Sequence, residues 1–265
     1  MTSTQINSFL KWVGGKKSII SELSKRLPKS YTEYHELFVG SGSFFFAIKP
    51  KKAHLYDVNF NLIITFRIVR DDVDKLINIL KKHKINHNKE YYLKARKQLL
   101  IKNNPLEIAG LLIYLNKTCF NGLYRVNKNG EFNVPIGSYK NPSIVNEKKL
   151  KSASRILQNV KILHCSFEKI TVKQNAFYYL DPPYHEAYNN YNSNIFGEKE
   201  HKQLTNFCHK INEVNGFFML SNSNTSLIKT LYKKYNIEQI MSFRSISCKV
   251  SKRGQFSELI IRNYN

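Results

Sequence analysis

Four consecutive residues, Asp181-Pro182-Pro183-Tyr184, combine the residue types best suited to chemistry in this sequence. They directly follow residues 176–180, an apolar run typical of a buried strand. Two prolines fix φ and remove two backbone donors. The turn therefore presents carbonyl oxygens and a carboxylate where open α/β sheets bind ligands. Acceptors beside an aromatic ring suit a planar ring with an exocyclic amino group. A plain proline turn with a capping aspartate is the alternative interpretation.

The glycine turn Phe38-x-Gly40-x-Gly42 is a second candidate ligand site, and it follows a predicted strand at 33–38. Glycines let a backbone approach a ligand closely. Asp57 ends the next predicted strand, and an acid in that place typically binds ribose hydroxyls. Two glycines, rather than the three of a dinucleotide fingerprint, favour a nucleoside-type ligand without a pyrophosphate.

The charge of the chain indicates a polyanionic partner. Its 265 residues include 42 Lys and Arg against 19 Asp and Glu, a formal net charge of +23. Such a balance is typical of nucleic-acid-binding proteins. An AT-rich coding bias would also raise the lysine content, although it does not explain the shortage of acids. A hydrophobic content of 42% favours a globular chain over a disordered one.

The sequence contains no signal for a membrane, a secretory route or a metal. No apolar run reaches the roughly 20 residues that a membrane span needs, and the first residues do not resemble a signal peptide. No cysteine pair has the C-x-x-C spacing, so we expect no structural zinc site and free thiols in a reducing, cytoplasmic compartment. The cysteines are Cys119, Cys165, Cys208 and Cys248.

The pattern of apolar residues predicts an α/β fold with an inserted helical domain. Strands are expected at 33–38, 53–57, 160–165, 176–180, 216–220, 237–241 and 258–262, with a short helix at 44–48. Residues 62–115 have helical periodicity, and Asn129-Gly130 predicts a hairpin between 124–126 and 131–134. We therefore expect a catalytic domain of residues 1–63 and 151–265, interrupted by a second domain of residues 64–150.

Several further segments, in this order along the chain, resemble the Dam family of DNA adenine-N6 methyltransferases. They are residues 9–16 (FLKWVGGK), 115–125 (LNKTCFNGLYR), 130–142 and 220–222, together with the glycine turn and Asp181-Pro182-Pro183-Tyr184. The resemblance extends from residue 9 to about 264. It implies a Rossmann-like S-adenosylmethionine-dependent methyltransferase sheet with an inserted, mainly helical DNA-recognition domain that contains a β-hairpin.

The resemblance also implies a set of cofactor-binding residues. The cofactor is S-adenosylmethionine, and the residues that would bind it are Trp12, Lys16, Phe38, Gly40, Gly42, Asp57, Ser166, Phe167 and Asp181. Taken alone, Trp12 is more readily interpreted as a core residue and Lys16 as a solvated charge; their place in the motif reverses this and favours the cofactor role.

The implied reaction is methyl transfer to adenine N6, with Asp181, Pro182, Pro183 and Tyr184 as the catalytic segment. Hydrogen bonds from N6 to Asp181 and the Pro182 carbonyl would localise the nitrogen lone pair, and Tyr184 would stack on the base. The adenine must leave the duplex to be reached. We expect a lid formed by Tyr188, Tyr191 and Phe196; exposed aromatic residues on a disordered loop are the alternative.

Target recognition would fall to the inserted domain. Arg125 suits a guanine edge, Leu123 and Pro135 a thymine methyl, and Phe120 the space left by the adenine. The DNA-binding residues implied by the family are Lys11, Phe120, Asn121, Leu123, Arg125, Pro135, Tyr139 and Lys140. Together they indicate GATC in duplex DNA. The basic residues Lys249, Lys252 and Arg253 are a further candidate phosphate-binding loop, with a solvated turn as the alternative.

Other functions remain open at this point. A related DNA site, an RNA substrate, a protein-glutamine substrate and a DNA-binding regulator without activity all fit parts of the pattern. The aspartate at position 181 argues against the protein-glutamine enzymes, which have asparagine there. The hairpin argues against RNA, and the intact motifs argue against an inactive regulator. We expect a monomer.

Overall fold

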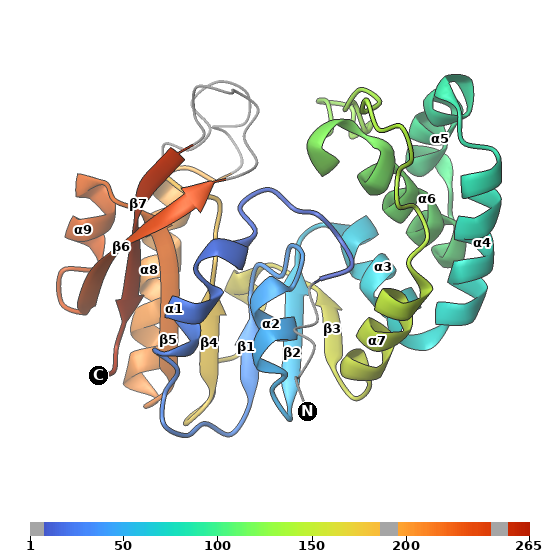
Figure 1. The fold of residues 1–265 in the computed structure, drawn as a ribbon. Coiled ribbons are helices and arrows are strands. Elements are labelled where there is room, and N and C mark those ends of the chain that lie inside the picture. The colour runs from blue at the N-terminus through green and yellow to red at the C-terminus, as the bar shows by residue number, and fades with distance from the viewer. Residues whose placement is uncertain (1–7, 186–195, 245–253) are drawn as a thin grey trace. The chain divides into compact units, whose positions relative to one another are not determined.

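The computed structural model describes residues 8–185, 196–244 and 254–265 (Figure 1). The chain packs as two compact units, each formed by several stretches of sequence. Unit 1 consists of Met1–Gly15, Gly40–Lys49 and Asn59–Ile162, and unit 2 of Lys16–Val39, Pro50–Val58 and Leu163–Asn265. The functional division into residues 1–63 with 151–265 and residues 64–150 stays a prediction.

A seven-stranded sheet dominates unit 2. Its order is β3-β2-β1-β4-β5-β7-β6, and its strands are β1 (Tyr34–Glu36), β2 (Ala53–Asp57), β3 (Lys161–His164), β4 (Phe177–Leu180), β5 (Phe217–Ser223), β6 (Asn236–Arg244) and β7 (Gly254–Arg262). β1 pairs in parallel with β2 and β4, and β4 with β5. β7 runs antiparallel between β5 and β6. This mostly parallel sheet confirms the predicted Rossmann-like methyltransferase fold.

The central strands are apolar because helices cover them. All four residues of β4 are buried, as expected for a parallel strand covered on both faces. α8 (Glu198–Glu213) packs Leu204, Phe207 and Ile211 into the same core as α9 (Ser226–Leu231). Unit 2 also contains α1 (Ile20–Ser24) and two 3₁₀ turns, η1 (Lys16–Ser18) and η3 (Phe167–Lys169). This core holds the strand ends in fixed positions.

Helices make up most of unit 1. They are α2 (Ser43–Ile48), α3 (Phe60–Asp71), α4 (Val73–Ile85), α5 (Lys89–Ile101), α6 (Pro105–Thr118) and α7 (Glu147–Leu157), with a 3₁₀ turn η2 (Phe120–Gly122). The helical periodicity predicted for 62–115 is confirmed and divided into four helices. Asn59, Asn88 and Asn104 each accept a backbone N–H and begin α3, α5 and α6. α6 is buried around nearly its whole circumference because its neighbours in unit 1 surround it. The sequence did not indicate α7.

The predicted hairpin is present in a shorter form. Val126 and Phe132 form a single antiparallel bridge, and no extended strand is assigned to either flank in the described chain. The Asn127 side chain accepts the backbone N–H groups of Asn129 and Glu131, and Gly130 has φ +79°. This is a three-residue turn with a left-handed glycine, a common connection in hairpins. The expectation of two paired strands was therefore wrong in extent.

None of the helices in the described stretches has the length and apolar character that a membrane span requires. The expected lid residues Tyr188 and Tyr191 lie outside the described residues, and so do Lys249, Lys252, Arg253 and Cys248.

Candidate active site

Several candidate residues in unit 2 lie together just beyond the carboxyl ends of the parallel strands. Glu36 is in register with Leu55 of β2 and with Tyr179 of β4. Continuing that register by two residues puts Phe38, Asp57 and Asp181 at one level, just beyond the ends of their strands. Open α/β sheets bind ligands at these strand ends.

Asp181 is held by two donors at one carboxylate oxygen. The Lys16 ammonium lies 2.6 Å from Asp181 Oδ1, and the side chain of Lys16 is only 7% exposed. The Ser221 hydroxyl donates to the same oxygen at 3.0 Å, because Leu180 is in register with Leu220. Oδ2 has no hydrogen-bond partner within the described parts of the chain. The second oxygen is therefore the one that can accept a hydrogen from a substrate.

Tyr184 is fixed at both its hydroxyl and its ring. Its hydroxyl donates to Glu258 Oε2 on β7 at 2.8 Å, and Glu258 is buried. The Lys16 ammonium lies 4.6 Å from the ring centroid. Lys16 therefore contacts both the carboxylate and the aromatic ring of the motif, so it is a neighbour of the predicted catalytic residues as well as a predicted cofactor residue.

Burial raises the pKa of Asp181 above its ordinary value, while the Lys16 ammonium and the Ser221 hydroxyl act in the opposite direction. Burial also raises the pKa of Tyr184, and the carboxylates of Asp181 and Glu258 add to that effect. Tyr184 is therefore a neutral ring at physiological pH, suited to stacking rather than to proton abstraction.

The remaining predicted cofactor residues of unit 2 lie near the same strand ends. Phe38 packs against Phe167, with ring centroids 5.9 Å apart. The Asp57 carbonyl accepts the backbone N–H of Cys165, which brings Ser166 close to the end of β2. The half-buried Asp57 and Ser166 supply polar groups beside an aromatic wall. This combination fits a nucleoside.

The other predicted cofactor residues, Trp12, Gly40 and Gly42, belong to unit 1. Gly40 has φ +48°, and a Cβ there would lie 2.9 Å from Trp12 Cδ1, so the indole requires glycine at this position. Trp12 also stacks on Tyr124, with ring centroids 5.2 Å apart and planes at 20°. A glycine turn beneath an aromatic ring fits a ligand with a flat or apolar part, as S-adenosylmethionine has.

The predicted recognition residues of unit 1 are brought together by short backbone pairings. Phe120 donates its N–H to the Pro135 carbonyl, and Cys119 bridges Ile136, so Phe120 and Pro135 are neighbours. Asn116 accepts the N–H of Lys11 and donates to its carbonyl, which ties Lys11 to this segment. The Lys11 ammonium contacts the Tyr139 hydroxyl at 3.3 Å. Asn121 lies in η2 and has φ +54°.

Exposure divides the recognition residues into two groups. Phe120 is 43% exposed, and Arg125, Pro135, Tyr139 and Lys140 are also exposed. Leu123 is only 7% exposed, so a contact with a thymine methyl would require it to move.

Arg125 is oriented by a neighbour that the sequence did not single out. Its Nε donates to Asn133 Oδ1 at 2.6 Å, and one Nη donates to the Asn133 carbonyl. The other Nη group has no hydrogen-bond partner in the part of the chain that the structure describes. Asn133 thus fixes the direction of the guanidinium before any ligand binds.

Sequence reasoning also did not give a role to Ser221 and Glu258. The segment 220–222 stood out as a motif, but its contact with Asp181 depends on β5 lying beside β4. Glu258 depends on the insertion of β7 between β5 and β6. The polar residues Ser221 and Asn222, which follow an apolar run, were the signal that could have pointed to a role for Ser221. The sequence contained no comparable signal for Glu258.

Comparison with known proteins agrees with this geometry. Residues 12–246 match the D12 class N6 adenine-specific DNA methyltransferase family. Type II methyltransferase M1.LlaDCHI of Lactococcus lactis subsp. cremoris is 36% identical over 272 residues, which cover 98% of this chain and 96% of the relative. Type II methyltransferase M.MjaIII of Methanocaldococcus jannaschii is 38% identical over 288 residues, with 98% and 100% covered. A DNA adenine methylase of Haemophilus influenzae is 31% identical over 263 residues, with 95% and 92% covered.

The chain belongs to the D12 class of N6 adenine-specific DNA methyltransferases. It is therefore an enzyme that acts on DNA, and the family implies S-adenosylmethionine as its methyl donor.

Proposed function

We propose that this enzyme methylates adenine N6 within GATC in duplex DNA, after the adenine has rotated out of the helix. The observation that supports the reaction best is the environment of Asp181, whose Oδ1 is occupied by Lys16 and Ser221 while Oδ2 has no partner in the described stretches. The target sequence rests on the recognition segment 115–142 and its resemblance to the Dam family.

The proposed chemistry depends on how the chain holds the amino group. Adenine N6 is a poor nucleophile because its lone pair is delocalised into the ring. Asp181 Oδ2 and the Pro182 carbonyl would each accept one N6 hydrogen, which localises the lone pair on nitrogen. Tyr184, anchored by Glu258, would stack on the base and fix its plane. When bound, S-adenosylmethionine supplies a methyl group on a cationic sulfur that leaves readily. Alignment therefore matters more than a strong base.

We assign cofactor binding to the residues that the resemblance to the Dam family implies. Asp57 would accept ribose hydroxyls, Ser166 and Phe167 would contact the adenine ring, and Phe38 would extend the aromatic wall. The remaining residues assigned to cofactor binding are Trp12, Gly40, Gly42 and Lys16. The donors and rings described above support each assignment, and the test is the loss of cofactor affinity in Asp57→Asn with unchanged DNA binding.

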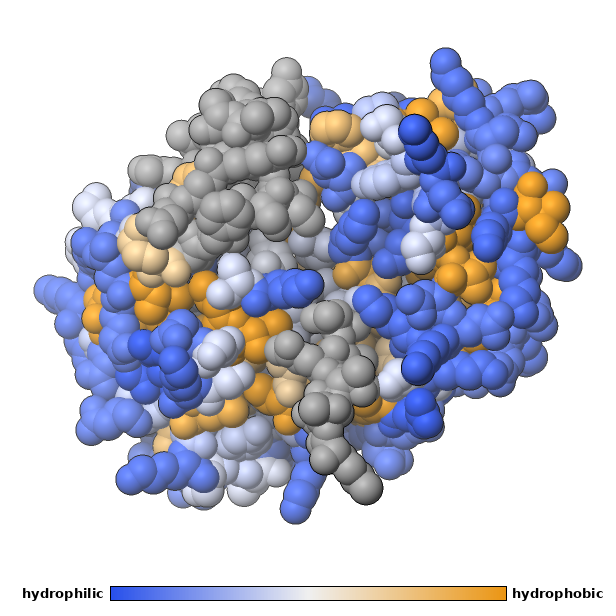
Figure 2. Space-filling view, in the orientation of Figure 1, coloured by the Kyte–Doolittle hydropathy of each residue, from blue (hydrophilic) through white to orange (hydrophobic). Residues whose placement is uncertain are grey.

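We assign base reading to the exposed part of the recognition segment. Arg125 would donate to a guanine edge, Pro135 and Leu123 would contact a thymine methyl, and Phe120 would fill the place of the flipped adenine. Lys11 would read the first base pair, and Asn121, Tyr139 and Lys140 would contact the backbone. The net charge of +23 supports a strong sequence-independent attraction to phosphates. Many of the coloured residues visible in Figure 2 are hydrophilic.

Sequencing of DNA methylated by the purified protein tests the target. We expect N6-methyladenine at GATC and unmodified adenine elsewhere. Modification at another motif would overturn the GATC assignment and leave the reaction intact. A duplex with 2-aminopurine at the target adenine tests base rotation, because unstacking raises its fluorescence. Unchanged fluorescence on saturation would contradict it.

Arg125→Ala tests the base-reading assignment. We expect about 5- to 150-fold weaker methylation of GATC, equivalent to about 1–3 kcal/mol, with relaxed discrimination at one base pair. Lys128→Ala, an exposed cation in the same hairpin, is the matched control and should lower affinity equally for all sequences. Unchanged specificity in Arg125→Ala would exclude Arg125 as the reader.

We further propose that the enzyme acts as a monomer in the cytoplasm. Cys119, Cys165 and Cys208 are free thiols, consistent with a reducing compartment. Light scattering during gel filtration, with and without a GATC duplex, tests the oligomeric state.

A further inference from the structure

We propose that Glu33, His35 and His54 form a binding site for one transition-metal dication of the zinc class. The three residues lie in unit 2 at the amino ends of β1 and β2. Asp181 follows the carboxyl end of β4, which runs parallel to β1. The cluster and the proposed active site therefore lie at opposite ends of the parallel strands.

Strand register gathers the three side chains. His35 on β1 is directly opposite His54 on β2, so both project from the same face of the sheet. Glu33 precedes His35 by two residues and therefore shares that face. All three side chains are buried, and their donor atoms lie within 4.8 Å of one another.

The separations between the carboxylate of Glu33 and each imidazole match those between two ligands of one zinc ion. Glu33 Oε1 lies 3.0 Å from His35 Nε2, and Glu33 Oε2 lies 3.4 Å from His54 Nε2. Two ligands that bind zinc at about 2.0–2.2 Å, at angles between about 90° and 110°, are about 2.9–3.4 Å apart. An ion could therefore enter between the carboxylate and the imidazoles once the imidazole rings rotate out of their parallel stack.

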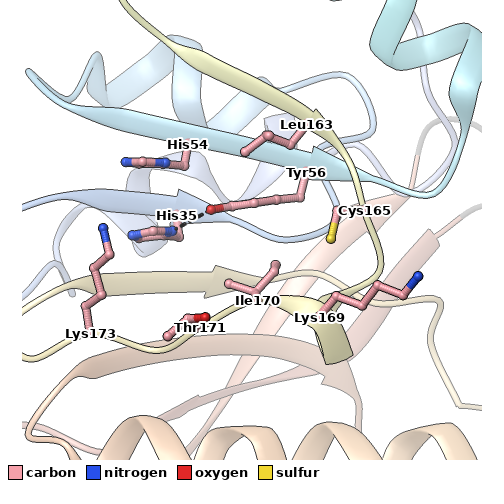
Figure 3. A pocket seen from close by; sticks show the side chains of 9 residues that line it. All are labelled: His35, His54, Tyr56, Leu163, Cys165, Lys169, Ile170, Thr171 and Lys173. Atoms are coloured by element: carbon pink, nitrogen blue, oxygen red, sulfur yellow. Dashed lines mark hydrogen bonds between the residues drawn. The ribbon is translucent and has the colours of Figure 1, made fainter.

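His35 is already held by a second contact, and its ring is stacked on that of His54, so the two rings must turn toward a shared ion. Figure 3 shows the rings of His35 and His54 lying parallel, with centroids 4.5 Å apart. The Tyr56 hydroxyl is 3.1 Å from His35 Nδ1, the nitrogen that does not face Glu33. Histidine ligands of metals usually have their second nitrogen held in this way. Two imidazoles and a carboxylate favour zinc, cobalt or nickel over magnesium or calcium, which prefer oxygen ligands.

A cavity of about 280 Å³ adjoins the cluster and gives an ion room for water ligands. It is lined by His35, His54 and Tyr56 from the sheet and is bounded on the opposite side by Ile170 and Thr171 (Figure 3). The three protein ligands would leave further coordination positions open toward this space.

Two lysines compete with a metal for Glu33. Lys52 Nζ lies 2.7 Å from Oε2 and Lys173 Nζ lies 2.7 Å from Oε1, and their side chains are 62% and 52% exposed. Both ammonium groups can therefore move into water at little cost. A bound dication would replace them and link β1 to β2. This competition predicts that removing either lysine tightens metal binding.

Titration of the untagged, chelator-treated full-length protein with Co²⁺ tests the site, because cobalt takes zinc ligand sets and absorbs visible light. We expect saturation at one ion per chain, visible bands without a thiolate charge-transfer band, and displacement by Zn²⁺. His54→Phe and His35→Phe should weaken binding about 100-fold. Lys52→Gln and Lys173→Gln should each tighten it about 2- to 5-fold.

Controls separate the site from general histidine binding and from misfolding. His209→Gln removes a half-buried histidine that contacts Tyr235 and should leave Co²⁺ affinity unchanged. Zn²⁺ should raise the melting temperature of the wild-type protein and of Lys52→Gln, but not of His54→Phe. Absence of saturable binding at millimolar Co²⁺, a thiolate band, or equal affinity in His54→Phe and the wild type would each overturn the proposal. Weaker binding in both lysine variants would exclude Glu33 as a ligand.

Discussion

Unit 2 holds two carboxylates near opposite ends of its parallel strands, the half-buried Asp181 and the buried Glu33, and they are neutralised in different ways. Asp181 pairs with a lysine that is 7% exposed, whereas Glu33 pairs with two lysines that are 62% and 52% exposed. The ammonium of Lys16 cannot leave Asp181 without losing its own partner in a buried place. Lys52 and Lys173 can leave Glu33 for water. The first arrangement fixes a carboxylate for chemistry, and the second leaves one that can exchange partners.

The fold also shifts the pKa values of the two carboxylates in opposite directions. Burial dominates at Asp181 and raises its pKa. At Glu33 burial also acts to raise the pKa, but hydrogen bonds from Lys173, Lys52 and His35 outweigh it and hold the pKa well below the ordinary range. The number of donors, rather than burial alone, decides the direction.

Asp181→Asn should give the largest change in the rate of methyl transfer. The amide presents no anionic oxygen to the N6 hydrogens, so we expect methyl transfer to fall about 10³-fold or more. Binding of a GATC duplex should change less than about threefold, because phosphate contacts dominate affinity. Single-turnover kinetics and fluorescence anisotropy measure the two quantities. Retained methylation would remove Asp181 from the reaction centre.

Replacing one lysine beside each carboxylate should give the next largest difference in methylation rate. Lys16→Met removes the main effect that opposes burial at Asp181, so the pKa of Asp181 should rise further. Because the ionised carboxylate is the active form, activity at pH 7 should fall about 100-fold and the rising limb of the pH–rate profile should move to higher pH.

Lys16→Arg keeps the charge and should keep the limb near its original position. Lys52→Met, the corresponding change beside Glu33, should alter the rate less than about twofold and leave the profile in place. Cofactor affinity is measured separately, because Lys16 is also assigned to that site. An unmoved limb in Lys16→Met would show that Lys16 does not tune Asp181.

Ser221→Ala removes the neutral donor from Asp181 Oδ1 while the Lys16 ion pair remains. The loss of one buried hydrogen bond should lower kcat about 5- to 10-fold, with little change in KM. Ser226→Ala, at an exposed serine that begins α9, is the matched control and should behave as the wild type. A rate equal to that of the wild type would assign the positioning of Asp181 to Lys16 alone.

Glu33→Gln should have the smallest effect, and it concerns stability. The folded-state pKa of Glu33 is below its ordinary value of 4.5, so ionised Glu33 stabilises the fold above about pH 4.5 and loses this contribution as the pH falls. The variant should unfold with about 1–2 kcal/mol less free energy at pH 7 and with a diminishing deficit below pH 4.5.

Urea unfolding at several pH values in the presence of a chelator measures this difference. Glu90→Gln changes an exposed glutamate paired with Lys94 and should not alter stability measurably. A deficit of Glu33→Gln that stays constant with pH would contradict the assigned direction of the pKa.

The sequence predicted the place of residues 181–184 in the fold well because its signal is local. An apolar run ends at residue 180, and a proline turn with one carboxylate follows immediately, so Asp181 had to lie at the end of a strand. The same logic placed Asp57 and the glycine turn. All of these residues depend on a single stretch of chain.

Contacts between strands that are distant in sequence could not be predicted in this way. Periodicity gives no strand order, so it could not place Glu258 opposite Tyr184 or Ser221 beside Asp181. The hairpin was predicted with longer strands than the single bridge between Val126 and Phe132, and local periodicity does not say how far two flanks stay paired. His35 and His54 are 19 positions apart in number yet directly opposite in register, and only the sheet reveals the pair.

The stacking of Trp12 on Tyr124 has a spectroscopic consequence. Trp12 is the single tryptophan of the chain, so all indole emission from the unlabelled protein originates beside the recognition hairpin. Emission from an indole changes when a neighbouring ring moves away. Stopped-flow fluorescence of the native protein can therefore time the moment at which Tyr124 leaves Trp12, without a dye and without a modified base.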